Sequence, residues 1–294
     1  MAEAVEISAA VVRAVGDDSR PLTVIAPPAL SLQLAWRSLR MLPRYADLLY
    51  TLTAHRIKVR YKQSLLGPAW AIFQPLAMMV VFAAVFSTIV RMPTGGHPFP
   101  VFAYSALLPW TAFAAAVGSA STSLVAHAGL VTRVYFPREI LPITYIAAAV
   151  FDLAVASTVL LAMVVYYQIA VTPALLWILP ILVLLAGVAL AVSLTLCAVH
   201  ARYRDVGVAM PLLLQIWFFA SPVLYPLAAV PAAWRPFYTL NPMAGIIDGF
   251  RGAVLEGRAP DLAALGSSFA VVIIGLPIAY LWFKHVDATM ADLV

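Results

Sequence analysis

From residue 69 onward the sequence alternates between long apolar blocks and short polar connectors. Six blocks approach the roughly 20 apolar residues that a helix needs to cross a bilayer. They cover about 69–90, 101–125, 142–167, 174–199, 208–227 and 263–283. The pattern predicts an all-α integral membrane protein with six transmembrane helices over 68–294.

The sequence before the first block is more polar and divides into two parts. Residues 1–30 show no clean period and no cleavable signal pattern, so we expect a mobile cytoplasmic tail. Over 31–67 the pattern is amphipathic, with Tyr45, Leu48, Leu49 and Leu52 on one helical face. Such a helix is expected to lie in the plane of the membrane interface.

Two connectors are more than turns. Residues 126–141 mix apolar and charged positions, as a short cytoplasmic helix resting on a partner would. Residues 228–262 are too apolar for a free loop and too interrupted for a full span. We interpret the second connector as short re-entrant or interfacial helices packed within the protein on the outer side.

Lys and Arg residues are distributed unevenly around these spans. Arg56, Lys58, Arg60 and Lys62 occupy alternate positions directly before the first span. With both termini in the cytoplasm, all but four of the 18 Lys and Arg residues lie on the cytoplasmic side, as the positive-inside rule requires. The four exceptions are Arg91, Arg235, Arg251 and Arg258.

The composition supports a membrane protein and narrows its chemistry. The chain is 64% hydrophobic and only 11% charged, with a mean hydropathy of +0.96. Its net charge of +5 follows from the basic cytoplasmic loops, so we expect no nucleic-acid partner. The single cysteine and five scattered histidines form no metal-binding pattern.

No nucleotide-binding motif is present. The phosphate-binding GxxxxGK[ST] pattern needs a Gly-Lys pair, and Lys58, Lys62 and Lys284 follow no glycine. We therefore expect a transport subunit rather than an enzyme. It would have no cofactor of its own, and ATP and Mg would be bound by a separate subunit.

Several residues have two interpretations at this level. Asp152, deep in a span, is either a functional carboxylate, as in a proton-coupled carrier, or a hydrogen-bonded packing residue; no basic partner within the membrane is evident. Tyr203-Arg204-Asp205 is either a solvated helix end or a docking site. Trp110, Trp234 and Tyr238 fit an outer aromatic belt as well as a sugar conduit, and Phe73 and Phe82 point to opposite helix faces.

An ordered set of short motifs covers roughly residues 45–258. Together these motifs resemble the transmembrane subunit of bacterial polysaccharide ABC exporters, the type-2 ABC permease family that exports O-antigen, teichoic acid and related glycans. The matching segments are Arg60-Tyr61-Lys62-Gln63-Ser64, Leu66-Gly67 with Trp70, Leu108-Pro109-Trp110, 134–142, Tyr203-Arg204-Asp205-Val206, Ser221-Pro222-Val223, Leu240-Asn241-Pro242-Met243 and Arg251.

The resemblance implies a homodimer in the bacterial cytoplasmic (inner) membrane, paired with two copies of an ABC nucleotide-binding ATPase. It implies export of an undecaprenyl-type lipid-linked glycan, with 126–141 as the coupling helix and 228–262 as outer gate helices. It assigns the substrate entrance to Arg56, Lys58, Arg60, Lys62, Leu66, Gly67 and Trp70; ATPase coupling to Arg133, Tyr135, Phe136, Pro137, Arg138, Glu139, Arg204 and Asp205; and the outer gate to Tyr225, Trp234, Tyr238, Asn241, Pro242 and Arg251.

Alternatives remain open beside this expectation. The basic residues 56–62 either hold a substrate pyrophosphate or only fix topology and attract lipid headgroups. A drug or small-lipid exporter of the same superfamily is the second candidate. A membrane-embedded transferase would need clustered acidic residues, whereas Asp17-Asp18 is the only adjacent acidic pair.

Overall fold

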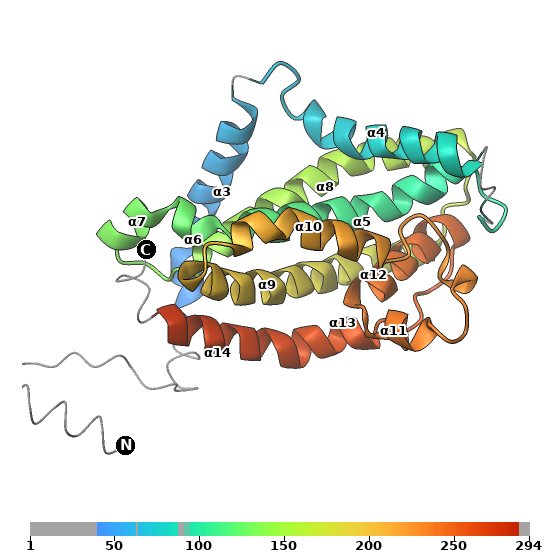
Figure 1. Ribbon diagram of the computed structural model, residues 1–294. Coiled ribbons are helices and arrows are strands. Elements are labelled where there is room, and N and C mark those ends of the chain that lie inside the picture. The colour runs from blue at the N-terminus through green and yellow to red at the C-terminus, as the bar shows by residue number, and fades with distance from the viewer. Residues whose placement is uncertain (1–39, 63, 88–91, 93, 288–294) are drawn as a thin grey trace, which may run out of the picture.

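A computed structural model describes residues 40–62, 64–87, 92 and 94–287. These residues form helices and connecting turns, without a strand in the described part. Figure 1 shows the long helices running side by side, with α6 and α7 at one end and α11 and α12 at the other. The expected tail at 1–30 lies outside the described residues. The bundle comprises α4 (Ala69–Val85), α5 (Phe99–Ala120), α8 (Ile140–Tyr166), α9 (Ile178–Arg202), α10 (Val206–Phe219) and α14 (Leu276–Asp287).

Helix α5 is the centre of the bundle. It packs against α4, α8, α9, α10 and α12, and most of its residues are buried. Its sequence is rich in alanine, and small side chains let neighbouring helices approach closely where no water drives their association. The membrane domain is therefore built around the second apolar block.

Among the described residues, four helical segments are long and apolar enough to cross a membrane: Phe99–Ala120, Ile140–Tyr166, Pro173–Arg202 and Gly266–Asp287. The fold is thus all-helical and multi-pass, as the sequence predicts. Helices α4 and α10 are apolar but have only 17 and 14 residues. At 1.5 Å per residue they extend about 26 and 21 Å, less than the hydrocarbon core of about 30 Å. The count of six spans stays a prediction.

The sequence gives physical reasons for the helix ends. Helix α10 stops at Phe219, because Ser221-Pro222 follows and the residue before a proline disfavours helical backbone. The last apolar block is divided into α13 (Gly266–Ala270), the π-helical turn η6 (Val271–Gly275) and α14. Pro277 follows that turn, and its missing N–H interrupts regular helical hydrogen bonding there.

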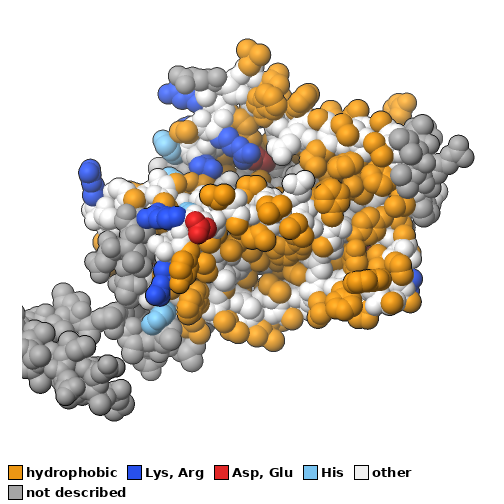
Figure 2. All heavy atoms as spheres, viewed as in Figure 1, with side chains coloured by type: hydrophobic (Ala, Val, Ile, Leu, Met, Phe, Trp, Pro, Cys, Tyr) orange, Lys and Arg blue, Asp and Glu red, His pale blue; other side chains and the backbone are white. Residues whose placement is uncertain are grey.

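Helix α3 (Ala46–Tyr61) lies against α8 at the end of the bundle that carries α6 (Ser123–Ala126) and α7 (Ala128–Arg133) (Figure 1). Its expected apolar face packs against a second hydrophobic cluster, formed with α9 and α14. Placement of this helix in a membrane interface stays a prediction. In Figure 2, Lys and Arg side chains gather over α3 and the α6–α7 end, whereas hydrophobic side chains cover most of the remaining face.

The 228–262 connector, called the outer connector after its predicted side of the membrane, contains short helices, as expected. They are η4 (Leu227–Ala229), α11 (Arg235–Leu240), α12 (Pro242–Arg251) and η5 (Gly252–Glu256). Helix α12 is buried against α5, α9 and α13, whereas α11 contributes no buried residue. Only part of this connector is therefore packed within the protein.

Candidate functional site

The expected entrance is built around Asp152, which lies on α8 about 18 Å from the start of that helix. Arg60 on α3 forms an ion pair with its Oδ2, and the hydroxyl of Tyr61 donates a hydrogen bond to its Oδ1. The assumption that Asp152 has no basic partner is wrong. The partner is 92 residues away in the sequence and reaches the carboxylate from the end of α3.

A second contact joins α3 to α8 nearer the α7 end. The guanidinium of Arg56 lies 3.5 Å from the ring centre of Tyr145 on α8. The Tyr145 hydroxyl lies 3.5 Å from Nδ1 of His127, which connects α6 to α7. Burial against this surface lowers the pKa of Arg56. Arg56 is therefore packed against an aromatic ring, whereas Lys58 and Lys62 are exposed.

The loop after α3 has the expected form. Gly67 adopts a left-handed backbone with φ +53°, and α4 begins two residues later, after Pro68. Glycine adopts this conformation without steric cost. Leu66 and Trp70 on either side of the turn are exposed. Of the predicted entrance residues, Lys58, Arg60, Lys62, Leu66 and Trp70 thus present side chains to the surroundings, and Arg56 is half-buried.

The 126–141 connector carries the helix α7 and then an extended turn. Tyr135 is 96% exposed, whereas the next residue, Phe136, is buried in the cluster under α3. Arg133 ends α7 and is exposed. The connector therefore holds one aromatic side chain inward and presents the other outward.

Arg138 and Glu139 contact the chain's own last helix. Nη1 of Arg138 lies 3.0 Å from Oδ1 of Asp287. The Glu139 carboxylate is 1% exposed, accepts a hydrogen bond from the Tyr280 hydroxyl at 2.8 Å and pairs with Nζ of Lys284 at 2.6 Å. The Glu139 side chain therefore faces inward, and the assignment of Arg138 and Glu139 to ATPase coupling stays a prediction.

The Tyr203-Arg204-Asp205 segment lies between α9 and α10, at the same end of the bundle. Tyr203 caps the C-terminus of α9, and Asp205 precedes α10 as its N-cap residue. All three residues are exposed. The segment turns the chain from one helix to the next and faces outward beside the 126–141 connector.

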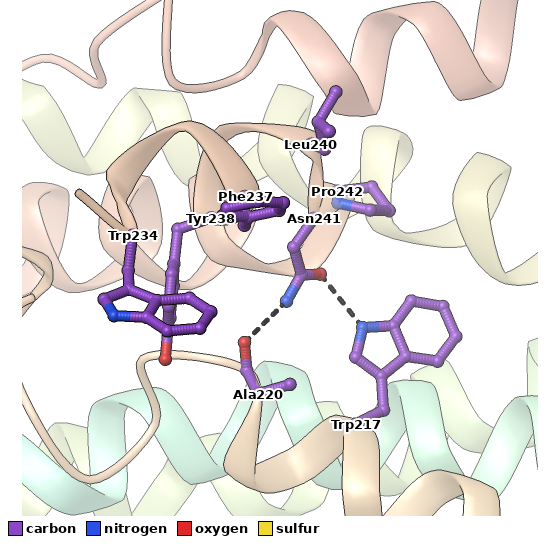
Figure 3. Close-up of a pocket in the computed structure, with 8 residues that line it drawn as sticks. All are labelled: Trp217, Ala220, Trp234, Phe237, Tyr238, Leu240, Asn241 and Pro242. Carbon is purple, nitrogen blue, oxygen red and sulfur yellow. Dashed lines mark hydrogen bonds between the residues drawn. The ribbon is translucent and has the colours of Figure 1, made fainter.

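The outer connector is organised by Asn241, whose amide makes four hydrogen bonds. Its Oδ1 accepts from the Trp217 indole at 2.9 Å and from the backbone N–H of Met243 at 3.0 Å, so it also caps α12. Its Nδ2 donates to the Ala220 carbonyl at 3.0 Å and to Ser221 Oγ at 2.9 Å. Figure 3 shows the bonds to Trp217 and Ala220 converging on the amide. Two of the family-like motifs, at 221–223 and 240–243, meet here.

A hollow of about 580 Å³ opens beside this amide. Its lining is mainly aromatic and apolar, and Figure 3 shows rings from the α10 side and the α11 side facing it. The Tyr238 hydroxyl lies 2.6 Å from that of Tyr225. The lining residues are Trp217, Ala220, Trp234, Phe237, Tyr238, Leu240, Asn241 and Pro242.

Arg251 stabilises the turn after α10 by hydrogen bonds to its backbone carbonyls. Its side chain is 2% exposed, and its Nη2 donates to the carbonyls of Val223 at 2.8 Å and Pro222 at 3.2 Å. Its guanidinium lies 3.8 Å from the ring centre of Phe102 on α5. Burial lowers the pKa of Arg251 to about 10, so the group remains charged near neutral pH. Arg251 connects the outer connector to the central helix.

Several aromatic residues form a cluster inside one copy of the chain. Phe82 on α4 stacks on Phe218 of α10 at 5.8 Å, and Trp110 on α5 contacts Phe218 and Trp217 edge-on. Trp110 is 4% exposed, so within one copy of the chain its ring lies in the core and lines neither an aromatic belt nor a conduit. Phe73 is exposed while Phe82 packs inward, which confirms that they point to opposite faces.

The structure thus brings the predicted residues together in two places. The entrance and coupling residues gather at the α3–α7 end, and the gate residues gather around α12. Sequence reasoning missed Tyr145, Trp217, Tyr280 and Asp287, because a lone side chain in an apolar stretch gives no signal of its partner. No group of three His, Cys, Asp or Glu residues suited to a metal occurs in the part of the chain that the structure describes.

Comparison with known proteins gives a family match and several relatives. Residues 47–255 match the family described as ABC-2 type transporter. An O-antigen export system permease protein, RfbA, of Myxococcus xanthus is 30% identical over 242 residues, which are 81% of this chain and 92% of that protein. RfbA of Klebsiella pneumoniae is 27% identical over 72% of this chain and 81% of its own length. The polysialic acid transport protein KpsM of Escherichia coli is 25% identical over 71% and 81%.

Proposed function

Because the chain belongs to the ABC-2 type transporter family and is one of its membrane permease subunits, we propose that it forms the channel of an ATP-driven exporter of lipid-linked polysaccharide. The observation that carries this proposal is the match to permeases named for O-antigen and polysialic acid export over most of the chain. The cargo is a glycan on an undecaprenyl-type carrier, taken from the cytoplasmic face of the inner membrane.

ATP hydrolysis takes place on a separate nucleotide-binding subunit, present in two copies. The sequence has no phosphate-binding Gly-Lys pair, which supports this division. Work is needed because a hydrated sugar polymer and a charged diphosphate cannot enter hydrocarbon without a large desolvation cost. The exposed side chains of Arg133, Tyr135, Arg204 and Asp205, at the α6–α7 end, are where this subunit docks.

Two copies of the chain enclose the conduit. Helices α4 and α10 support this arrangement, because both are apolar but shorter than a full membrane span, and they contact each other through Phe82 and Phe218. Both present exposed apolar side chains, including Phe73 on α4 and Ile216 on α10. A second copy packed on these faces covers them and compensates for their short lengths.

The two ends of the conduit have different chemistry. At the cytoplasmic end the exposed Lys58, Arg60 and Lys62 receive the diphosphate of the carrier lipid. At the outer end the aromatic hollow beside Asn241 and Tyr238 contacts the emerging sugar chain (Figure 3). Flat rings suit this role because they pack on sugar faces without forming hydrogen bonds that retain the chain.

Depletion of this protein in its host tests the proposal. Lipid-linked glycan is quantified with a probe that reaches only the outer face of the inner membrane, before and after permeabilisation. We expect long glycan to accumulate shielded on the cytoplasmic side. Normal surface glycan without accumulation would contradict the proposal and favour export of a drug or small lipid instead.

A control separates loss of export from loss of synthesis. The same cells are complemented with the wild-type gene, and total glycan is measured alongside accessible glycan. A fall in total glycan without a shielded pool would place the protein in synthesis rather than export. Restoration of surface glycan by the wild-type gene ties the effect to this chain.

A further inference from the structure

In the proposed entrance Arg60 binds the diphosphate of the carrier lipid, but in this structure its guanidinium is already paired with the carboxylate of Asp152. Arg60, like Arg56, contacts α8 from helix α3, and its guanidinium is occupied by Asp152. The Arg60 side chain is 44% exposed, whereas that of Asp152 is 14% exposed. The guanidinium therefore has room to turn outward, and the carboxylate does not.

The carboxylate has a second donor that stays when Arg60 leaves. Arg60 contacts Oδ2, whereas the Tyr61 hydroxyl donates to Oδ1. Burial and the hydrogen bond to Asp152 raise the pKa of Tyr61 to about 12, so its hydroxyl keeps its proton near neutral pH. Asp152 thus keeps one hydrogen bond in either state, which lowers the cost of exchanging its partner.

We propose that Asp152 is a specificity-determining residue of the entrance, which occupies Arg60 in the empty protein and is displaced from it by the diphosphate of an incoming amphiphile. The proposal rests on the proposed export function and names the chemical group that the entrance selects. Guanidinium binds carboxylate and phosphate with the same planar pair of donors, so one can replace the other.

The exchange discriminates by charge. A neutral lipid that pushes Arg60 aside leaves a carboxylate in the membrane domain without its cation, which is costly. A diphosphate supplies more negative charge than the carboxylate, so it can replace the carboxylate as the partner of the guanidinium. Asp152 therefore competes with incoming headgroups for the Arg60 guanidinium, and only a strongly anionic headgroup displaces it.

The test measures binding to the full chain, purified with its ATPase subunit in a non-ionic detergent. The probes are farnesyl diphosphate, farnesol and inorganic diphosphate, with affinities from calorimetry. Asp152→Asn removes the competitor, so we expect it to bind farnesyl diphosphate at least threefold more tightly, with farnesol unchanged. Arg60→Gln is expected to bind it at least tenfold more weakly, and the double variant to behave as Arg60→Gln does.

Tyr61→Phe is a second variant, and it is expected to change the affinity for farnesyl diphosphate in the direction opposite to Asp152→Asn. Without the hydroxyl, the released carboxylate has no donor, so the exchange costs more and farnesyl diphosphate is expected to bind several-fold more weakly. A purely structural role of the cluster would shift Asp152→Asn and Tyr61→Phe in the same direction and would change farnesol equally. Asp47→Asn, which removes an exposed carboxylate from the same helix, is the matched control and is expected to bind as wild type does.

The outcomes separate this proposal from the export function. Wild-type binding of farnesyl diphosphate with no gain in Asp152→Asn would overturn the role of Asp152 and leave the function standing. Binding of inorganic diphosphate alone would overturn the lipid-linked substrate. Absence of binding by every variant to either phosphate probe would overturn both.

Discussion

The indole nitrogen of Trp217 donates a hydrogen bond to Oδ1 of Asn241 at 2.9 Å, across the turn that joins α10 to the outer helices (Figure 3). The same oxygen caps α12, and the same amide donates to Ala220 and Ser221. One side chain therefore sets the position of α12 relative to α10. This explains how a single asparagine holds a segment that the sequence marks only as an interrupted apolar connector.

Replacement of Asn241 by alanine is expected to lower the free energy of unfolding by about 2 kcal/mol, because it removes a helix cap and leaves the Trp217 indole unpaired. Trp217→Phe, which keeps the ring but removes the N–H, is expected to cost about 1 kcal/mol. Denaturant titration of the purified protein measures both. The double variant should cost less than the sum, since both changes remove the same bond. Additive costs would show that the bond contributes nothing.

The ion pair between Lys284 of α14 and Glu139 offers a second test. Lys284→Met is expected to lower the free energy of unfolding by about 3 kcal/mol, because it leaves the buried carboxylate of Glu139 without a cation. Glu139→Gln should cost less, about 1–2 kcal/mol, because Lys284 still lies 3.4 Å from Asp287. Thermal and denaturant unfolding measure the difference. Equal losses of unfolding free energy in the two variants would contradict the interpretation that Glu139 is more deeply buried than Lys284 and depends more on its partner.

A glycine in α12 permits a close contact between backbones. A Cβ on Gly245 of α12 would lie 2.1 Å from the backbone oxygen of Ala264, so Gly245→Ala requires a backbone shift. We expect a loss of about 3 kcal/mol in the free energy of unfolding. Gly129→Ala in α7 is the matched control, because nothing lies within 4 Å of its Cβ. Equal stability of the two variants would show that α12 does not approach the Ala264 backbone so closely.

The sequence predicts the helices well because their signal is local. Apolar blocks, the Gly67-Pro68 turn and the proline after α10 each determine a boundary through their own residues. The end of the first block at about residue 90 stays a prediction. Helix α4 ends at Val85, and residues 88–91 lie outside the described part of the chain.

The candidate site is harder to predict because its members are far apart in the sequence. Asp152 and Arg60 are 92 residues apart, and Glu139 and Lys284 are 145 apart. Each residue alone looks like a solvated charge or an isolated intramembrane acid. The contacts depend on how α3 packs against α8 and on how α14 packs against α9, which hydropathy does not specify.

The exposed ring of Tyr135 gives the sharpest test of the proposed ATPase contact. Tyr135→Ala is expected to leave the free energy of unfolding within about 0.5 kcal/mol of wild type, since the side chain touches little of its own chain. If the ring is an anchor of the interface, its loss weakens assembly with the ATPase by about 2 kcal/mol, or about thirtyfold. Affinity of the two purified subunits and ATP-driven export in vesicles measure this effect.

Two further variants decide between an interface effect and a folding effect. Tyr50→Ala removes another exposed ring, on α3 rather than on the 126–141 connector, and is expected to bind the ATPase as wild type does. Phe136→Ala removes the buried neighbour and is expected to lower the free energy of unfolding by about 3 kcal/mol, because it leaves a cavity beneath α3. A Tyr135→Ala variant that assembles and exports normally would move the contact away from this connector, leaving Arg204 and Asp205 as the docking residues to test.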